Sequence, residues 1–295
     1  MIHDHSFFLP GNRTGILLIH GLTGTPNEMR GIARRFHQAG YSVYGVQLAG
    51  HCGQVEDLVN SRWQDWFESV KQAADTLKAQ TDEIYVAGLS MGALLALKYA
   101  STYPVAGVIA YSPTFQYDGW SIPRWSKVLA PILLPSVHYL NIFKSKTFDE
   151  AEPYGIKNKA LRARIAHSMQ NCDSSEAGLP GNPWHSLYQL QCLSRDVRKN
   201  LSKIHSPCLL LHAYDDDISH RKNSQLVYDS VSGVKRMVLL HNSYHMITID
   251  NDREQVIDES IDFIQQYQRK DTSLSGYTIP PHAHSLGQMK ADVLQ

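Results

Sequence analysis

The segment Gly88-Leu89-Ser90-Met91-Gly92 decides how this chain is expected to fold. It directly follows an apolar run at residues 84–87 and directly precedes a stretch of helical composition at residues 93–100. A tight turn between a strand and a helix needs very small side chains on both sides of its central residue, and glycine meets that need. The segment therefore predicts a sharp strand-turn-helix corner that presents the Ser90 hydroxyl.

A serine at the tip of such a corner is a candidate nucleophile. The amide of Met91 would lie at a helix N-terminus, where partial positive charge stabilises a negatively charged oxygen. The same five residues can also form an ordinary corner without chemistry. Because the expected strand and the expected helix both flank the segment, we interpret Ser90 as catalytic.

The rest of the chain repeats the alternation of strand and helix that flanks this corner. Apolar runs predict strands at residues 15–20, 41–46, 84–87, 105–111, 208–212 and 235–240, with helical patterns between most of them. This alternation predicts an α/β fold with a mostly parallel, doubly wound sheet and helices on both faces. In such sheets reactive groups gather at the carboxyl ends of the strands, where Ser90 would lie.

The alternation stops between residues 113 and 206. A connection of this length is an insertion rather than a loop. We expect a core formed by residues 1–112 and 207–269, with a helical cap at 113–206 inserted after the fourth recognisable strand. The alternative for this segment is a packing subdomain with no role at the site. Residues 270–295 show no periodicity and predict a flexible tail.

Composition restricts the classes of partner. The chain has 295 residues and a formal net charge of zero, which gives no reason to expect a nucleic-acid partner. The four cysteines lack metal-type spacing, and no nucleotide-binding loop follows a strand, so no metal and no cofactor are expected. No segment resembles a signal peptide or has the length of a membrane span, which predicts a cytoplasmic protein.

A serine nucleophile needs a base, and the base needs a carboxylate that orients it. Histidine residues 241 and 245 follow the strand at 235–240, and we favour His245 because His241 directly abuts that strand. The aspartates at 215–217 follow the strand at 208–212, and Asp216 is preferred over Asp217. An acidic triplet of this kind is otherwise an ordinary solvated turn.

A serine nucleophile of this kind also needs a second backbone amide that stabilises the negative oxygen of the substrate. Residues 20–24, His-Gly-Leu-Thr-Gly, lie between the first predicted strand and its helix, and the glycines allow close approach of the backbone. The amides of Leu22 and Met91 are therefore the predicted oxyanion hole. Ordinary turn chemistry is the alternative for these glycines, and His20 is expected to brace the loop.

Apolar residues of the insertion are candidates for binding substrate. Either they line an acyl pocket or they pack between the cap and the sheet. The residues predicted on this basis are Trp120, Trp125, Leu129, Ile132 and Leu133.

In combination, these motifs resemble the α/β-hydrolase superfamily, and most of all its bacterial carboxylesterase and monoacylglycerol-lipase branch. The matching segments are residues 20–26, 50–51, 88–92 and 244–250, together with Asp216. The resemblance implies that Ser90, His245 and Asp216 form a catalytic triad that works through an acyl-enzyme and needs no cofactor. It also implies substrates that are small or medium acyl esters, including monoacylglycerols. Cys52 departs from the pattern, because a second glycine often follows Gly50-His51.

Two other functions remain open from the sequence. An acyl thioesterase or an amidase would use the same triad. A ligand receptor on the same scaffold would bind without turnover, although a receptor does not need an intact triad. The sequence leaves the oligomeric state undetermined.

Overall fold

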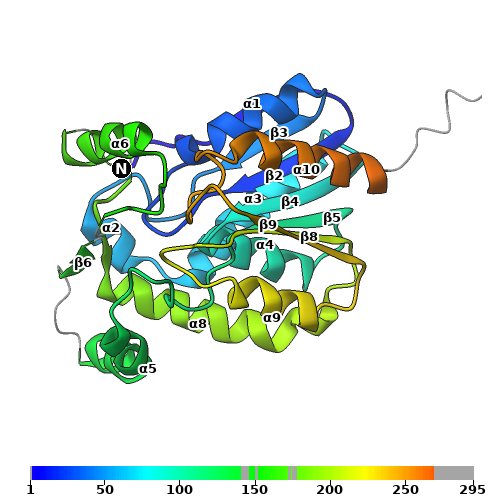
Figure 1. The fold of residues 1–295 in the computed structure, drawn as a ribbon. Coiled ribbons are helices and arrows are strands. Elements are labelled where there is room, and N and C mark those ends of the chain that lie inside the picture. The colour runs from blue at the N-terminus through cyan, green and yellow to red at the C-terminus, as the bar shows by residue number, and fades with distance from the viewer. Residues whose placement is uncertain (1, 141–145, 150–151, 172–173, 175–177, 269–295) are drawn as a thin grey trace, which may run out of the picture.

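The computed structural model describes residues 2–140, 146–149, 152–171, 174 and 178–268. Seven strands form its main sheet in the order β1-β3-β2-β4-β5-β8-β9 (Figure 1). The strands are β1 (Phe7–Leu9), β2 (Thr14–Ile19), β3 (Ser42–Val46), β4 (Glu83–Leu89), β5 (Gly107–Tyr111), β8 (Cys208–Ala213) and β9 (Lys235–Leu240). Six of them match the predicted strands, and the expected α/β fold with a mostly parallel sheet is confirmed.

Strand β1 is the one strand of this sheet that the sequence did not predict. It has only three residues and pairs antiparallel with β3, whereas the other neighbours in the sheet pair in parallel. A three-residue apolar run carries too little periodicity to distinguish a strand from a loop. Its place at the edge of the sheet does not affect the carboxyl ends of the central strands.

Helices cover both faces of the sheet. Side chains that alternate along β2 point to opposite faces, so Ile16 and Leu18 belong to one apolar cluster and Leu17 and Ile19 to the other. Helices α1 (Arg30–Gln38) and α10 (Arg253–Tyr267) pack on the first face. The second face carries α3 (Trp63–Lys78), α4 (Met91–Ala100), α8 (Trp184–Asn200) and α9 (Lys222–Ser230). The short helices are η1 (Pro26–Met29), α2 (Val55–Asn60) and η2 (Leu201–Lys203).

The order of the strands creates a crevice at their carboxyl ends. From β2 the chain moves outward to β3, and from β4 it moves in the opposite direction to β5. The loops that leave the neighbouring strands β2 and β4 therefore diverge, which is where α/β sheets bind their ligands. Gly21 follows β2 and Ser90 follows β4, so both predicted parts of the site lie at this point.

The segment predicted as a cap contains α5 (Arg124–Tyr139), β6 (Thr147–Asp149), α6 (Lys159–Asn171), β7 (Gly181–Pro183) and α8. Strands β6 and β7 form a small antiparallel sheet that the helical prediction did not include. Helix α8 packs through Leu193 and Val197 into the same apolar cluster as α4, so it completes a layer of the core. The predicted tail at 270–295 lies outside the described residues.

No helix of the described residues combines the length and the apolar character that a membrane span requires. The cytoplasmic location stays a prediction. In the same part of the chain, His, Cys, Asp and Glu side chains do not assemble in groups of three or more that would hold a metal ion. Cys192 and Cys208 are free thiols, and Cys172 is outside the described residues.

Candidate active site

Ser90 sits on a strained corner between β4 and α4. Its backbone has φ 57° and ψ −114°, a left-handed conformation that L-residues rarely adopt. A Cβ atom at Gly88 would lie 2.2 Å from the carbonyl oxygen of Gly92, and one at Gly92 would lie 2.2 Å from that of Ile19. Both positions therefore exclude any larger residue, which explains the spacing of the glycines around Ser90.

Neighbouring strands hold the corner in place. The Ser90 amide donates to the carbonyl of Tyr111 at the end of β5, over 2.9 Å. The Ser90 hydroxyl donates to Oγ1 of Thr114, over 3.1 Å. Ser90 and His245 line the same cavity of about 370 Å³. To act as a nucleophile, the hydroxyl has to turn from Thr114 toward the imidazole.

His245 and Asp216 form a buried pair beside this cavity. His245 follows β9 and Asp216 follows β8, and the Nδ1 atom of His245 lies 2.8 Å from Oδ2 of Asp216. Both residues are almost fully buried. Because a carboxylate only accepts, Nδ1 carries the hydrogen and Nε2 is left with the lone pair that a general base uses.

The Asp216 carboxylate is held by further donors. Oδ1 accepts from the amides of Ile218 at 2.9 Å and Ser219 at 2.7 Å. Oδ2 also lies 3.2 Å from Nε2 of the buried His212. Burial alone would raise the pKa of Asp216, but His245 and the hydrogen bonds from both histidines outweigh it and hold the pKa well below its usual range. In the folded protein, Asp216 is therefore an anion near neutral pH.

Asp217 has a different environment. Its Oδ2 accepts from the amide of Gly155 at 3.0 Å, and its Oδ1 accepts from the amide of His245 at 3.4 Å. Burial and the charge of Asp216 raise the pKa of Asp217. Of the two candidate aspartates, Asp216 contacts the imidazole ring, and Asp217 contacts the backbone that carries it.

The loop after β2 lies against Ser90. A Cβ atom at Gly21 would be 3.6 Å from that of Ser90, and Gly21 and Leu22 both line the cavity. The Glu28 carboxylate accepts from the Gly21 amide at 3.4 Å and fills the space beside Gly24. Met91 is the first residue of α4, so its amide lies at the positive end of that helix.

Two buried histidines, His20 and His51, support the loop after β2. His20 Nδ1 donates to the carbonyl of Gly21 at 2.9 Å, and its Nε2 accepts from the amide of Leu48 at 3.3 Å. The ring of His51 lies edge-on to that of His20, with 4.9 Å between the centroids. Burial lowers the pKa of His20 well below its usual value, and the nearby His51 lowers it further. Burial also lowers the pKa of His51 to about 4.

The low pKa of His51 makes stability depend on pH. The unfolded chain binds a proton near pH 6.5 but the folded chain only near pH 4, so stability is full above pH 6.5 and declines as the pH falls toward 4. We expect His51→Asn to reduce this decline by roughly 2–3 kcal/mol between pH 7.5 and pH 4.5. Urea unfolding at both pH values measures it, with His37→Asn on the surface as the control. An unchanged decline in His51→Asn would contradict the assignment.

Cys52 lies at the position where the resemblance leads us to expect a second glycine. Its φ is 62°, in the region that favours glycine, two residues after Gly50, which has φ 75°. The residue therefore keeps the loop geometry at the cost of local backbone strain.

The cap segment forms one wall of the Ser90 cavity. Its residues on this wall include Tyr154, Ile156, Leu161 and Leu179. The Leu179 amide donates to the carbonyl of Thr23 at 3.0 Å. On the other side, Asp250 accepts from the amides of Lys157 and Asn158 and from that of Tyr244. The cap is thus tied to the loops that precede α1 and follow β9.

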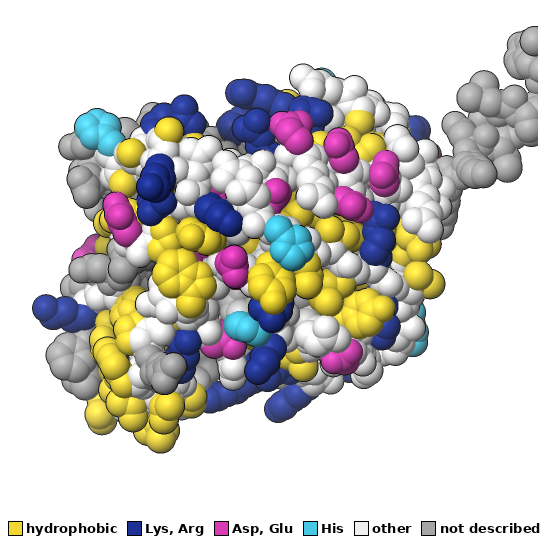
Figure 2. Space-filling model, viewed as in Figure 1, with side chains coloured by type: hydrophobic (Ala, Val, Ile, Leu, Met, Phe, Trp, Pro, Cys, Tyr) yellow, Lys and Arg dark blue, Asp and Glu magenta, His cyan; other side chains and the backbone are white. Residues whose placement is uncertain are grey.

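The five predicted substrate-binding residues do not line the Ser90 cavity. Trp120 is 59% exposed and Ile132 on α5 is 71% exposed, so neither packs between the cap and the sheet. Figure 2 shows the hydrophobic side chains gathered over α5 at the lower left of the view. Leu129 and Trp125 are also exposed, although Trp125, like Leu133, lines a second cavity. The apolar composition of α5 did not indicate which side faces inward.

Several residues at the site were not predicted from sequence. Thr114 follows β5 and meets the Ser90 hydroxyl, and His212 lies in β8 beside Asp216. Arg164 of α6 and Glu28 line the Ser90 cavity as polar groups. The position of Thr114 just after a strand was a usable signal, since the carboxyl ends of parallel strands meet at one edge.

Comparison with known proteins identifies the group to which this arrangement belongs. The family model described as serine aminopeptidase, S33, matches residues 11–252, a span that contains Ser90, Asp216 and His245. The chain belongs to this family. The hydrolase is thereby a member of the α/β-hydrolase superfamily, as the sequence predicted, and its relatives are named as lipases and esterases.

Two curated relatives cover most of this hydrolase. The thermostable monoacylglycerol lipase of Bacillus sp. (strain H-257) is 28% identical over 263 residues, which are 88% of this chain and 94% of that protein. The carboxylesterase of Bacillus subtilis (strain 168) is 26% identical over 262 residues, which are 88% and 96%.

Solved structures share the fold of this hydrolase. A metagenome-derived lipolytic enzyme has a TM-score of 0.73 at 24% identity, with 88% of this chain and 97% of that chain covered. The monoacylglycerol lipase of Paleococcus ferrophilus also has a TM-score of 0.73, at 17% identity over 90% and 100% of the two chains. At these identities the likeness supports the fold only.

Proposed function

We propose that this hydrolase cleaves carboxylic esters with Ser90 as nucleophile, His245 as base and Asp216 as the residue that orients the base. The observation that carries the proposal is the 2.8 Å contact between His245 Nδ1 and Asp216 at the edge of the cavity that contains Ser90. The names of the two curated relatives support the ester as the bond that is cleaved.

The residues act in a fixed order. Nε2 of His245 takes the proton of the Ser90 hydroxyl while Oγ attacks the carbonyl carbon of the ester. The negative carbonyl oxygen accepts hydrogen bonds from the amides of Leu22 and Met91. The leaving alcohol takes the proton from His245, and the acyl group stays on Ser90. Water, deprotonated by the same imidazole, then releases the acid.

The Ser90 cavity favours a polar alcohol and a small or medium acyl chain. Its polar lining includes Asn27, Glu28, Arg164 and Arg253, which can bind hydroxyl groups. Ile156, Leu161 and Ile165 provide an apolar side for a hydrocarbon chain. A monoacylglycerol combines both properties, and the mechanism uses only groups of this chain and water.

Turnover on matched substrates tests the proposal. p-Nitrophenyl esters, the corresponding acyl-CoA thioesters and acyl p-nitroanilides should be compared at equal acyl length. We expect many turnovers with kcat/KM highest for the esters. A preference for thioesters or anilides would replace the ester hydrolase with an acyl thioesterase or an amidase. Stoichiometric binding without turnover would indicate a receptor and contradict the proposal.

A further inference from the structure

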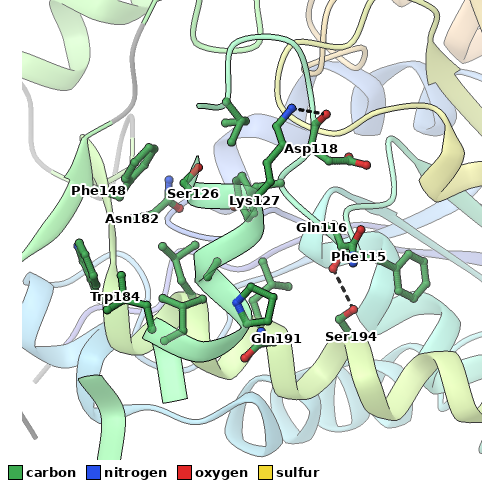
Figure 3. Close-up of a pocket in the computed structure, with 18 of the residues that line it drawn as sticks. Phe115, Gln116, Asp118, Ser126, Lys127, Phe148, Asn182, Trp184, Gln191 and Ser194 are labelled. Atoms are coloured by element: carbon green, nitrogen blue, oxygen red, sulfur yellow. Dashed lines mark hydrogen bonds between the residues drawn. The ribbon is translucent and has the colours of Figure 1, made fainter. Parts of the chain in front are cut away.

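A second cavity of about 330 Å³ lies beside the Ser90 cavity. It is lined by α5, by α8 and by the segment 115–118 that follows β5, as Figure 3 shows. Its walls are mostly aromatic and aliphatic, with Phe115, Leu134, Phe148, Trp184 and Leu187 among them. No step of the proposed mechanism uses any of these side chains.

The charged residues around this cavity do not make its interior polar. The Lys127 ammonium donates to the backbone carbonyls of Asp118 at 2.9 Å and Gly119 at 2.8 Å. Arg198 lies over the ring of Phe115, 5.3 Å from its centroid, and the side chain is otherwise open to solvent. The space between these groups therefore suits a hydrocarbon.

Tyr117 connects the two cavities. Among the described residues it is the one side chain that lines both of them. It is half-buried and packs on the apolar cluster of α4 and α8. It also lies three residues after Thr114, which meets the Ser90 hydroxyl. An acyl chain that is attached at Ser90 and is longer than the first cavity reaches the ring of Tyr117, which separates the first cavity from the second.

We infer that the second cavity binds the distal part of a long acyl chain and that Tyr117 determines how far a chain extends from Ser90. The inference rests on the proposed function. The acyl part is the occupant because the polar lining of the Ser90 cavity suits the alcohol. Each methylene that enters the second cavity is worth about fourfold in kcat/KM.

A chain-length series on defined variants tests the inference. p-Nitrophenyl esters from butyrate to palmitate are compared by their kcat/KM relative to butyrate. Ala130→Phe and Ser126→Phe each place a ring in the second cavity from α5, and two variants guard against one that fails to fold. We expect both to reduce the palmitate-to-butyrate ratio at least tenfold. Val128→Phe on the exposed side of α5 is the matched control and should keep the wild-type ratio.

Removing the Tyr117 ring should change the palmitate-to-butyrate ratio in the opposite direction. Tyr117→Ala joins the cavities and should raise the palmitate-to-butyrate ratio several-fold, whereas Tyr117→Phe keeps the ring and the wild-type ratio. A ratio that is unchanged in the filling variants, or unchanged in Tyr117→Ala, overturns the inference while activity on butyrate leaves the proposed function intact. Absence of activity on every ester, with the wild-type chain folded, is instead a failure of the proposed function.

Discussion

Ser90→Ala is expected to lower kcat for p-nitrophenyl butyrate by about 10³-fold or more. The substitution removes the hydroxyl that forms the acyl-enzyme, while the amides of Leu22 and Met91 remain. Burst and steady-state kinetics measure the loss. An alanine fits the corner at this position, because the strain lies in the backbone conformation and the neighbouring glycines provide the space.

Ser101→Ala is the matched control for this experiment. Ser101 lies at the other end of α4, where its hydroxyl donates to the carbonyl of Lys98. We expect its kcat to stay within about twofold of the wild type, since it is remote from the cavity. If Ser90→Ala kept more than a tenth of the wild-type kcat, Ser90 would not be the nucleophile.

Asp216→Asn is expected to lower kcat by about 10³- to 10⁴-fold. The substitution removes the anion that keeps hydrogen on Nδ1 of His245 and that stabilises the imidazolium formed during attack. The pH range of the assay does not alter the result, because the pKa of Asp216 lies well below its usual range and the carboxylate is charged throughout.

Asp217→Asn separates the two aspartates. Asn keeps an oxygen that accepts from the amide of Gly155 or from that of His245, and neither bond reaches the imidazole ring. We expect a loss in kcat of less than about tenfold, together with lower thermal stability. Equal losses in the two variants would show that the contact between Asp216 and the ring is not the one that matters for turnover.

The sequence predicted the elements that carry the proposed catalytic residues, because their order along the chain has a geometric meaning. In a parallel sheet the residues after β4, β8 and β9 arrive at the same edge, whatever their distance in sequence. The glycines at 88 and 92 indicated the corner because a Cβ atom at either position would lie only 2.2 Å from a backbone oxygen.

Other features depend on side-chain direction and were beyond this reasoning. Asp216 and Asp217 are neighbours whose carboxylates point to different partners, so spacing alone left the choice between them open. The apolar residues of α5 were expected at the substrate, but Leu129 and Ile132 are exposed. A helix that is apolar on several sides gives no sequence signal for its inward face.

The role of His212 illustrates the same limit. The residue lies inside the apolar strand β8, and its sequence context is that of a core position. Its Nε2 atom lies 2.8 Å from the carbonyl of Ser219 and 3.2 Å from Oδ2 of Asp216. Since both partners only accept, Nε2 carries hydrogen and His212 supports the acid of the proposed triad.

The most direct test of the account is covalent labelling by a fluorophosphonate, followed by mass mapping of the modified peptide. The account predicts one adduct per chain on Ser90 of the folded protein, no adduct in Ser90→Ala, and slow labelling in Asp216→Asn. A folded wild-type protein that hydrolyses esters with Ser90 unlabelled, or with the adduct on another residue, would contradict it.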